Sequence, residues 1–116
     1  LDCLGFAVEA GGKKFVYSGD TGINDNITAL CRDANFLLHW CYRGAGEQLH
    51  PALQAFSPDP GEVADMAKSA GVKRLYLSHF RIHMDSQEGH KKALADLSAR
   101  FAGETGIVED LDVFDI

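Results

Sequence analysis

The sequence predicts an α/β fold with a mixed sheet that opens in a β-hairpin and has helices packed against it. Two observations favour this fold. Short apolar runs alternate with stretches of helical periodicity along nearly all of the 116 residues, and a glycine pair separates the first two apolar runs. The element order alone also allows an unrelated flavodoxin-like protein. The opening hairpin and the lack of a glycine-rich phosphate loop argue against that alternative.

The first 40 residues are expected to form a hairpin, a helix and a further strand. These elements are predicted at residues 3–8, 13–18, 24–33 and 35–40. The hairpin turn falls at Gly11-Gly12, because glycine adopts the positive φ angles that such turns need. The helix begins at Asn24 or Asn26, either of which can cap it. The run Phe36-Leu37-Leu38 predicts a strand buried on both faces.

The rest of the chain predicts a loop, two helices and further strands. The elements are expected at residues 60–70, 72–78, 87–102 and, as one or two short strands, 106–116. Residues 41–60 lack periodicity, and a loop this long is usually functional or flexible. The helix that follows has Asp59 as its N-cap, Glu62 at its third position and Gly71 at its end.

The composition limits the possible functions. The net charge is −6, with 17 acidic and 11 basic residues, which disfavours a nonspecific nucleic-acid surface. No apolar stretch approaches the ~20 residues of a membrane span. The cysteines Cys3, Cys31 and Cys41 have no CxxC spacing, so they predict neither a zinc finger nor a disulfide framework. We therefore expect a cytoplasmic protein with reduced thiols and a single domain over residues 1–116.

Two predicted strands end in side chains that can bind a metal. One ends in Ser18-Gly19-Asp20-Thr21 and the other in Ser78-His79-Phe80. Ligands and metals collect at the rim of a sheet, where such strand ends lie. A carboxylate and an imidazole are both good ligands for zinc. We therefore predict that Asp20 and His79 meet at one metal ion. The simpler interpretation, that Asp20 only caps a turn, remains open on these residues alone.

The order and spacing of these motifs resemble the C-terminal half of the metallo-β-lactamase fold, nearest to its ribonuclease Z and aryl- or alkyl-hydrolase-like branches. The resemblance runs along nearly the whole chain. It rests on residues 4–8, 14–22, 34–39, 60–67 and 70–80. It implies half of an αββα sandwich, that is, one sheet with its helices and an apolar face that belongs to a larger domain.

The resemblance also implies a chemistry. In that family the aspartate of the first motif bridges two metal ions, usually zinc, and the histidine of the second binds one of them. Asp20 would then be the catalytic bridging ligand and His79 a ligand. Two such ions lower the pKa of a bridging water and produce hydroxide at neutral pH. The implied function is a metal-dependent hydrolase that cleaves a phosphodiester or ester-type bond in a small-molecule or phosphodiester substrate.

Two positions depart from the pattern of those branches. The strand that ends in His39-Trp40 commonly ends in His-Glu, and a histidine is common where this chain has Ser57. Serine does not replace an imidazole as a proton donor, so a ribonuclease Z mechanism is in doubt. We expect His39 to be a buried hydrogen-bond partner behind the site and Ser57 to be structural. His83 either lines the pocket or lies on the surface.

The histidine-rich motif that supplies most ligands in the family is absent from this chain, which begins at Leu1 in what resembles the middle of a strand. Two protein ligands cannot hold a two-zinc site, so we expect the isolated chain to be inactive. A missing N-terminal half, or a second copy of the chain, would complete the site and the sandwich. The alternative is a non-catalytic, degenerate half-domain that self-associates or binds a partner.

Overall fold

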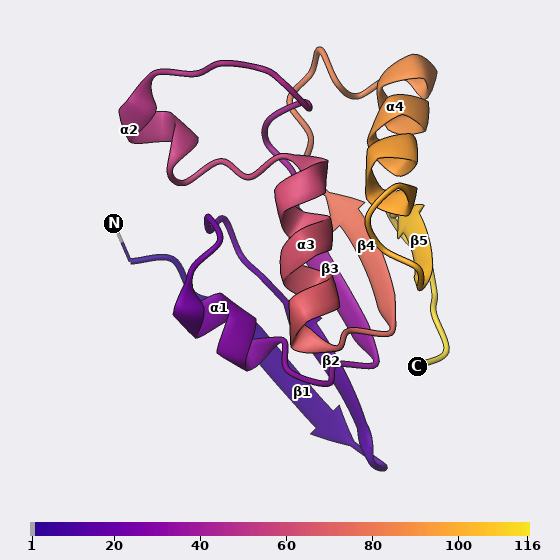
Figure 1. Ribbon diagram of the computed structural model, residues 1–116. Helices are drawn as coiled ribbons and strands as arrows, with labels where there is room; N and C mark the ends of the chain where they lie inside the picture. The colour runs from indigo at the N-terminus through magenta and orange to yellow at the C-terminus, as the bar shows by residue number, and fades with distance from the viewer. Residues whose placement is uncertain (1) are drawn as a thin grey trace.

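The computed structural model describes residues 2–116 as one mixed sheet with helices on one side. The strands are β1 (Phe6–Ala10), β2 (Lys13–Tyr17), β3 (Phe36–Trp40), β4 (Arg74–Ser78) and β5 (Glu104–Ile107). The helices are α1 (Asp25–Leu30), α2 (Pro51–Gln54), α3 (Pro60–Ala70) and α4 (Gln87–Ser98). The five strands lie in the order β1-β2-β3-β4-β5 (Figure 1). Only β1 and β2 are antiparallel, and the other pairs are parallel.

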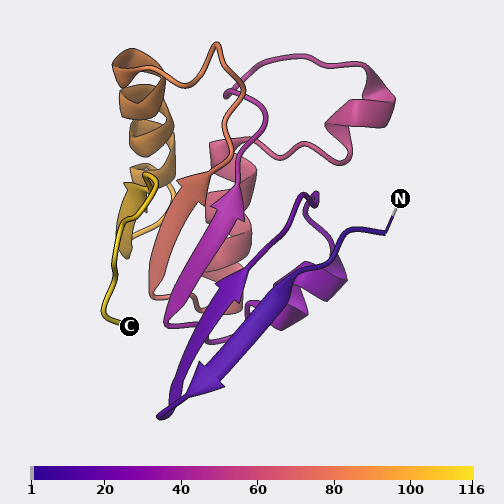
Figure 2. The same cartoon turned by 180° about the vertical axis from the view of Figure 1, so that it is seen from behind.

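The helices α1, α3 and α4 all cover the same face of the sheet. Figure 1 shows them in front of the strands, and Figure 2 shows the opposite face, on which no helix of residues 2–116 lies. A mixed sheet with an opening hairpin and packed helices was the fold expected from the sequence, and the structure confirms it. Of the helices in residues 2–116, none has the length and apolar character to cross a membrane.

The core lies between the sheet and these helices. Alternate strand residues point into it, and Val16, Leu37 and Leu75 are fully buried there. On the helix side, α3 contributes Val63 and α4 contributes Leu97, both also fully buried. The hydrophobic pattern of the sequence therefore fixes which face of each element is inside.

The other face of the sheet is only partly covered. The register pairs Phe6 with Tyr17 and Val8 with Phe15, so these side chains share one face. Phe6 and Val8 are 56% and 58% exposed. At the β3–β4 end, the C-terminal segment covers this face, because the centroid of the Phe114 ring lies 5.0 Å from that of Phe36 and 4.9 Å from that of Tyr76. The β1–β2 end therefore presents an open apolar surface.

Helix caps follow the sequence closely. Asp59 and Glu62 form the expected capping box at the start of α3, and Gly71 ends that helix with a φ of 74°. Of the two candidate caps for α1, the structure selects Asn24, whose side chain accepts from the N–H groups of Asn26 and Ile27. These caps are local, which is why residue type alone predicts them.

Several element boundaries differ from the expectation. Helix α1 ends at Leu30 rather than residue 33, and α4 ends at Ser98 rather than residue 102. For the start of β1 and the extent of β5, a neighbouring strand sets the limit. β1 starts at Phe6 rather than residue 3, since its partner β2 ends at Tyr17. β5 is a single strand, Glu104–Ile107, which pairs along β4 only as far as Leu77. The loop at 41–60 contains the one-turn helix α2, where the Ala52 N–H donates to His50 Nδ1 at 3.3 Å.

The cysteines divide into one exposed and two buried thiols. Cys3 is exposed, whereas Cys31 and Cys41 lie in the core, and all three are free. Burial raises the pKa of the Cys31 and Cys41 thiols to about 12. Those two thiols stay protonated at neutral pH and act as small apolar core groups.

Candidate metal site

Asp20 and His79 lie next to each other at the carboxyl edge of the sheet. They follow β2 and β4, which flank β3 and run parallel to it. His79 Nδ1 is 2.9 Å from Asp20 Oδ1, although the residues are 59 positions apart in the sequence. Their side chains are 47% exposed for Asp20 and 56% for His79. The structure thus brings these two predicted ligands together at an accessible rim.

Sharp turns after the strands bring the two side chains to this position. Gly19 has a φ of 63°, and a Cβ there would collide with the Leu4 carbonyl. His79 has a φ of 58°, an unusual conformation for a residue with a side chain. Strained backbone of this kind is concentrated at functional sites. The turn at Gly19 is visible in the sequence, whereas the left-handed histidine is not.

His39 is on the helix-facing side of β3, in register with Leu77. It is fully buried, and its Nδ1–H donates to the Trp40 carbonyl at 2.8 Å. Burial lowers the pKa of its imidazole to about 4, and the hydrogen bond to Trp40 opposes this only in part. His39 is therefore neutral at pH 7. No hydrogen bond joins it to Asp20 or His79 in the part of the chain that the structure describes.

Ser57 is buried just before α3, and a buried arginine holds it there. Arg43 Nε donates to the Ser57 carbonyl at 2.9 Å. The same guanidinium donates to Glu62 Oε2 at 2.6 Å and lies 3.4 Å from Asp59 Oδ2. Arg43 thereby ties the loop after β3 to the first turn of α3. Sequence reasoning missed this residue, because an arginine in a loop without periodicity has no pattern that marks it as buried.

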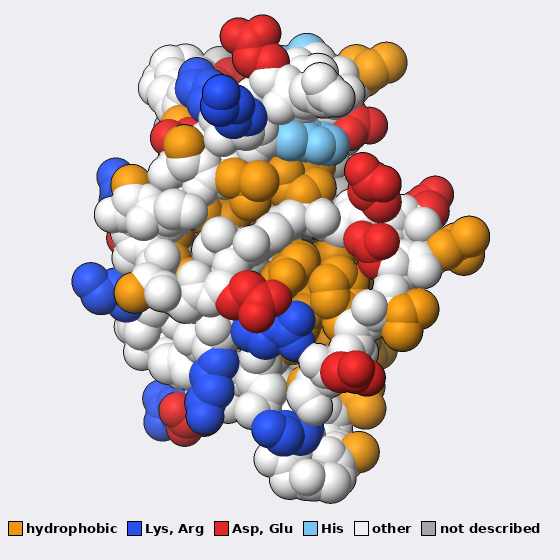
Figure 3. Space-filling view, turned by 90° about the vertical axis from the view of Figure 1, so that its right-hand side faces the viewer, with side chains coloured by type: hydrophobic (Ala, Val, Ile, Leu, Met, Phe, Trp, Pro, Cys, Tyr) orange, Lys and Arg blue, Asp and Glu red, His pale blue; other side chains and the backbone are white. Residues whose placement is uncertain are grey.

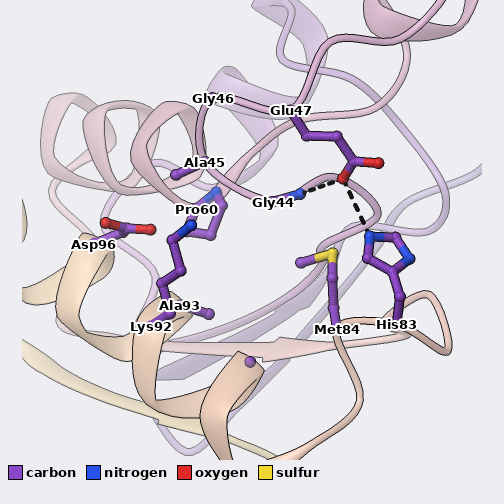
Figure 4. A pocket seen from close by; sticks show the side chains of 11 residues that line it. Gly44, Ala45, Gly46, Glu47, Pro60, His83, Met84, Lys92, Ala93 and Asp96 are labelled. Carbon is purple, nitrogen blue, oxygen red and sulfur yellow. Dashed lines mark hydrogen bonds and ion pairs between the residues drawn. The ribbon is translucent and has the colours of Figure 1, made fainter.

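His83 lines a cavity that does not include His79. The cavity has a volume of about 540 Å³ and lies between the loop after β3 and α4 (Figure 4). His83 Nε2 is 3.3 Å from Glu47 Oε2, and Arg81 donates to the other oxygen of Glu47 at 2.7 Å. The pKa of Glu47 is lowered, mainly because its carboxylate accepts a hydrogen bond from the Gly44 N–H.

His79 belongs to a second cleft, of about 530 Å³, on the β5 side of the molecule. The other charged or titratable residues that line this cleft are Asp85, His90, Glu109 and Asp110. Figure 3 views this side and shows histidine and acidic side chains close together on it. His90 is held by Asp85 at 2.8 Å. The surface next to His79 is therefore acidic.

The donor atoms present fit part of a zinc site. A carboxylate and an imidazole are the ligand types that zinc accepts, and their shared rim is open to solvent. Within residues 2–116, no group of three or more His, Cys, Asp or Glu side chains is arranged to hold a metal ion. The described chain thus offers two candidate ligands where a catalytic zinc site needs at least three.

Comparison with known proteins finds a matching family model and several similar proteins. A family model described as a β-lactamase superfamily domain matches residues 1–80. The chain is 40% identical over 68 residues to the ribonuclease Z of Methanosarcina acetivorans, covering 59% of this chain and 22% of that protein. It is 29% identical over 99 residues to the ribonuclease Z of Halobacterium salinarum, covering 85% and 31% of the two chains. The chain thus spans between a fifth and a third of the length of these relatives.

A solved structure has the same arrangement of elements. The metallo-β-lactamase fold protein YhfI from Bacillus subtilis matches with a TM-score of 0.76 at 21% identity. The match covers 94% of this chain and 42% of that one. At this identity the likeness establishes the fold alone, and it agrees with the half sandwich expected from the sequence.

Proposed function

The chain belongs to the β-lactamase superfamily, and from this we propose that it is the C-terminal portion of a metal-dependent hydrolase that cleaves a phosphodiester or ester-type bond. In this proposal Asp20 and His79 are ligands of a two-zinc site. The remaining ligands come from sequence outside this chain. Zinc, when bound, would lower the pKa of a water and supply hydroxide at neutral pH.

The observation that carries the proposal is the 2.9 Å contact between Asp20 Oδ1 and His79 Nδ1 at an open rim. In the neutral ring, an Nδ1–H that donates to Asp20 leaves the Nε2 lone pair on the far side of the ring, away from the carboxylate. The contact therefore supports the proposal by bringing both side chains to one point of the rim, and Nδ1 would give up its proton to bind an ion shared with Asp20. A carboxylate also has a second oxygen, so Asp20 can bridge two ions.

The substrate class follows from the relatives and from charge. The relatives named ribonuclease Z support a phosphodiester. The acidic residues around His79, Asp85 and Glu109 among them, oppose a long polyanion at that cleft. A small phosphodiester or an ester fits both observations better than a long nucleic acid does.

The partner of this chain would cover the open sheet face. Phe6 and Val8 are each more than half exposed on that face, and a contiguous apolar surface of this kind is typical of an interface. We expect the N-terminal half of the same domain to lie there, and a second copy of the chain is the alternative. Either partner could also supply the missing ligands.

A second candidate function is a non-catalytic half-domain that self-associates or binds a partner. It is favoured by the absence of a third candidate ligand next to Asp20 and His79 in residues 2–116. The two candidates differ in metal content. A half-domain of this kind would purify without zinc, and its mass in solution would be that of a discrete dimer or complex.

Metal analysis of the intact protein tests the hydrolase. We expect bound zinc in the wild type and loss of both zinc and activity in Asp20→Ala. Asp25→Ala is the matched control, because it removes an exposed carboxylate from the start of α1 and leaves the rim untouched. An Asp20→Ala protein that keeps its full metal content and activity would refute the proposal.

A further inference from the structure

We propose that Trp40 is a positioning residue of the site, which fixes the loop that carries Asp20 and the ring of His79 at the same time. This inference rests on the proposed function and names a residue that the family pattern does not predict, since this position commonly holds a glutamate in the related branches. The argument uses three contacts of one buried residue, one from its backbone N–H and two from its indole.

Trp40 is the last residue of β3, between the two strands that lead to the site. The residue is buried, with 7% of its surface exposed. Its backbone N–H donates to Ser18 Oγ at 3.1 Å, and that hydroxyl donates to the Gly19 carbonyl at 2.7 Å. The backbone of Trp40 thus holds the start of the turn that presents Asp20.

The indole binds the other end of the same turn. Trp40 Nε1 donates to the Thr21 carbonyl at 2.6 Å, in a partly buried position. Contacts to Ser18 and Thr21 therefore lie on both sides of Asp20 in the sequence. Because the turn is held at both ends, the Asp20 carboxylate has a fixed position. A turn attached to the sheet only through β2 would leave that carboxylate free to move.

The same indole also packs against His79. The ring centroids of Trp40 and His79 are 5.8 Å apart, with an angle of 49° between the planes. The indole also contacts Tyr42, and the centroids of these two rings are 5.3 Å apart. In the register of β3 and β4, Trp40 lies opposite Ser78, the residue before His79. The indole is thus an aromatic contact for the His79 ring.

These contacts divide the role of Trp40 into two parts that substitutions can separate. The Nε1–H holds the turn at Thr21, and the ring packs against His79. Phenylalanine keeps an aromatic ring but has no N–H, whereas alanine removes both. Residues that orient metal ligands from behind typically change metal affinity by about 10–100-fold when they are replaced.

Zinc affinity of the intact protein, measured by competition with a chromophoric chelator, is the first test. We expect Trp40→Ala to bind zinc about 10–100-fold more weakly and Trp40→Phe to lie between it and the wild type. Phe36→Ala is the matched control, because Phe36 is a buried aromatic residue at the opposite end of the same strand. The control should keep the wild-type affinity. Equal losses for Phe36→Ala and Trp40→Ala would overturn the proposal.

The ¹⁵N spectrum of the His79 imidazole in the metal-free protein is the second test. We expect the wild type to show mainly the Nδ1–H tautomer that donates to Asp20, and Trp40→Ala to move towards a mixture of the two tautomers. If the wild type takes up no zinc, the proposed function fails, while this spectrum still decides the role of Trp40. If Trp40→Ala does not fold, Trp40→Phe carries the test, with a displaced Thr21 amide signal as its expected result. Unchanged His79 and Thr21 signals in these variants would refute the positioning role.

Discussion

His79 Nδ1 lies 2.9 Å from Asp20 Oδ1, and His79 reaches this position from a left-handed backbone conformation with a φ of 58°. Neither residue belongs to a strand, since β2 ends at Tyr17 and β4 at Ser78. The contact is therefore made by two turns, each of which leaves the sheet at the same edge. The strained conformation of His79 persists because β2 and β4, both paired with β3, fix the positions at which the two turns begin.

The strain at His79 predicts a difference between two substitutions. His79→Gly and His79→Ala both remove the imidazole and its contact with Asp20. Only alanine keeps the steric cost of a positive φ, so we expect His79→Ala to be less stable than His79→Gly by about 1 kcal/mol. Urea unfolding of the two variants measures this difference. An alanine variant as stable as the glycine variant would show that the left-handed conformation is not kept in solution.

The backbone conformation of Gly19 leads to a second prediction, about stability at the same edge of the sheet. Its φ is 63°, and a Cβ would collide with the backbone of Leu4. We expect Gly19→Ala to lose more than about 1 kcal/mol of stability, because the strain of a positive φ and the collision add. Gly46→Ala is the control, since Gly46 has a φ of 74° but no atom within 4 Å of an added Cβ. Equal losses for the two variants in chemical unfolding would mean that Leu4 moves away easily.

The sequence predicted those parts of the fold and site that depend on local rules and strand direction. The capping box of Asp59 and Glu62 follows from residue types three positions apart. The meeting of Asp20 and His79 follows from topology, because β2 and β4 both run parallel to β3, which lies between them, and so end at the same edge. Their role as metal ligands stays a prediction.

The parts that sequence reasoning missed depend on contacts between distant, non-periodic segments. Trp40 reaches Thr21 across 19 positions and Arg43 reaches Glu62 across 19. No spacing rule connects such pairs, since a loop can bring any of its residues to a given place. The boundary of β1 was missed for a related reason, because the end of β2 sets it.

Arg43 predicts a large loss of stability from a single loop residue. Its side chain is buried and donates to the Ser57 carbonyl and to the carboxylates of Asp59 and Glu62. Arg43→Met leaves a buried acceptor without its donor, so we expect a loss of about 2 kcal/mol. Arg100→Met is the control, because the pair of Arg100 and Asp65 is exposed and such pairs contribute less than about 1 kcal/mol. Thermal or urea unfolding of both variants gives the comparison, and equal losses would contradict the anchoring role of Arg43.

His39 predicts how the stability of the fold depends on pH. Burial lowers the pKa of its imidazole to about 4, from the ordinary value of 6.5. Between these two values the unfolded chain binds a proton that the folded chain does not, so the free energy of unfolding falls as the pH falls. The contribution is fully present above pH 6.5 and is lost as the pH drops towards 4, by at most about 3 kcal/mol.

Urea unfolding between pH 4 and pH 7.5 measures this dependence, with His39→Leu as the comparison. The wild type should lose stability steeply below pH 6.5, and the variant should show a flatter curve in that window, whatever its absolute stability. Glu47 does not interfere, because its lowered pKa places its own loss of stability below pH 4.5. Curves with the same slope for both proteins between pH 4.5 and 6.5 would mean that His39 is protonated as readily in the folded chain as in the unfolded one.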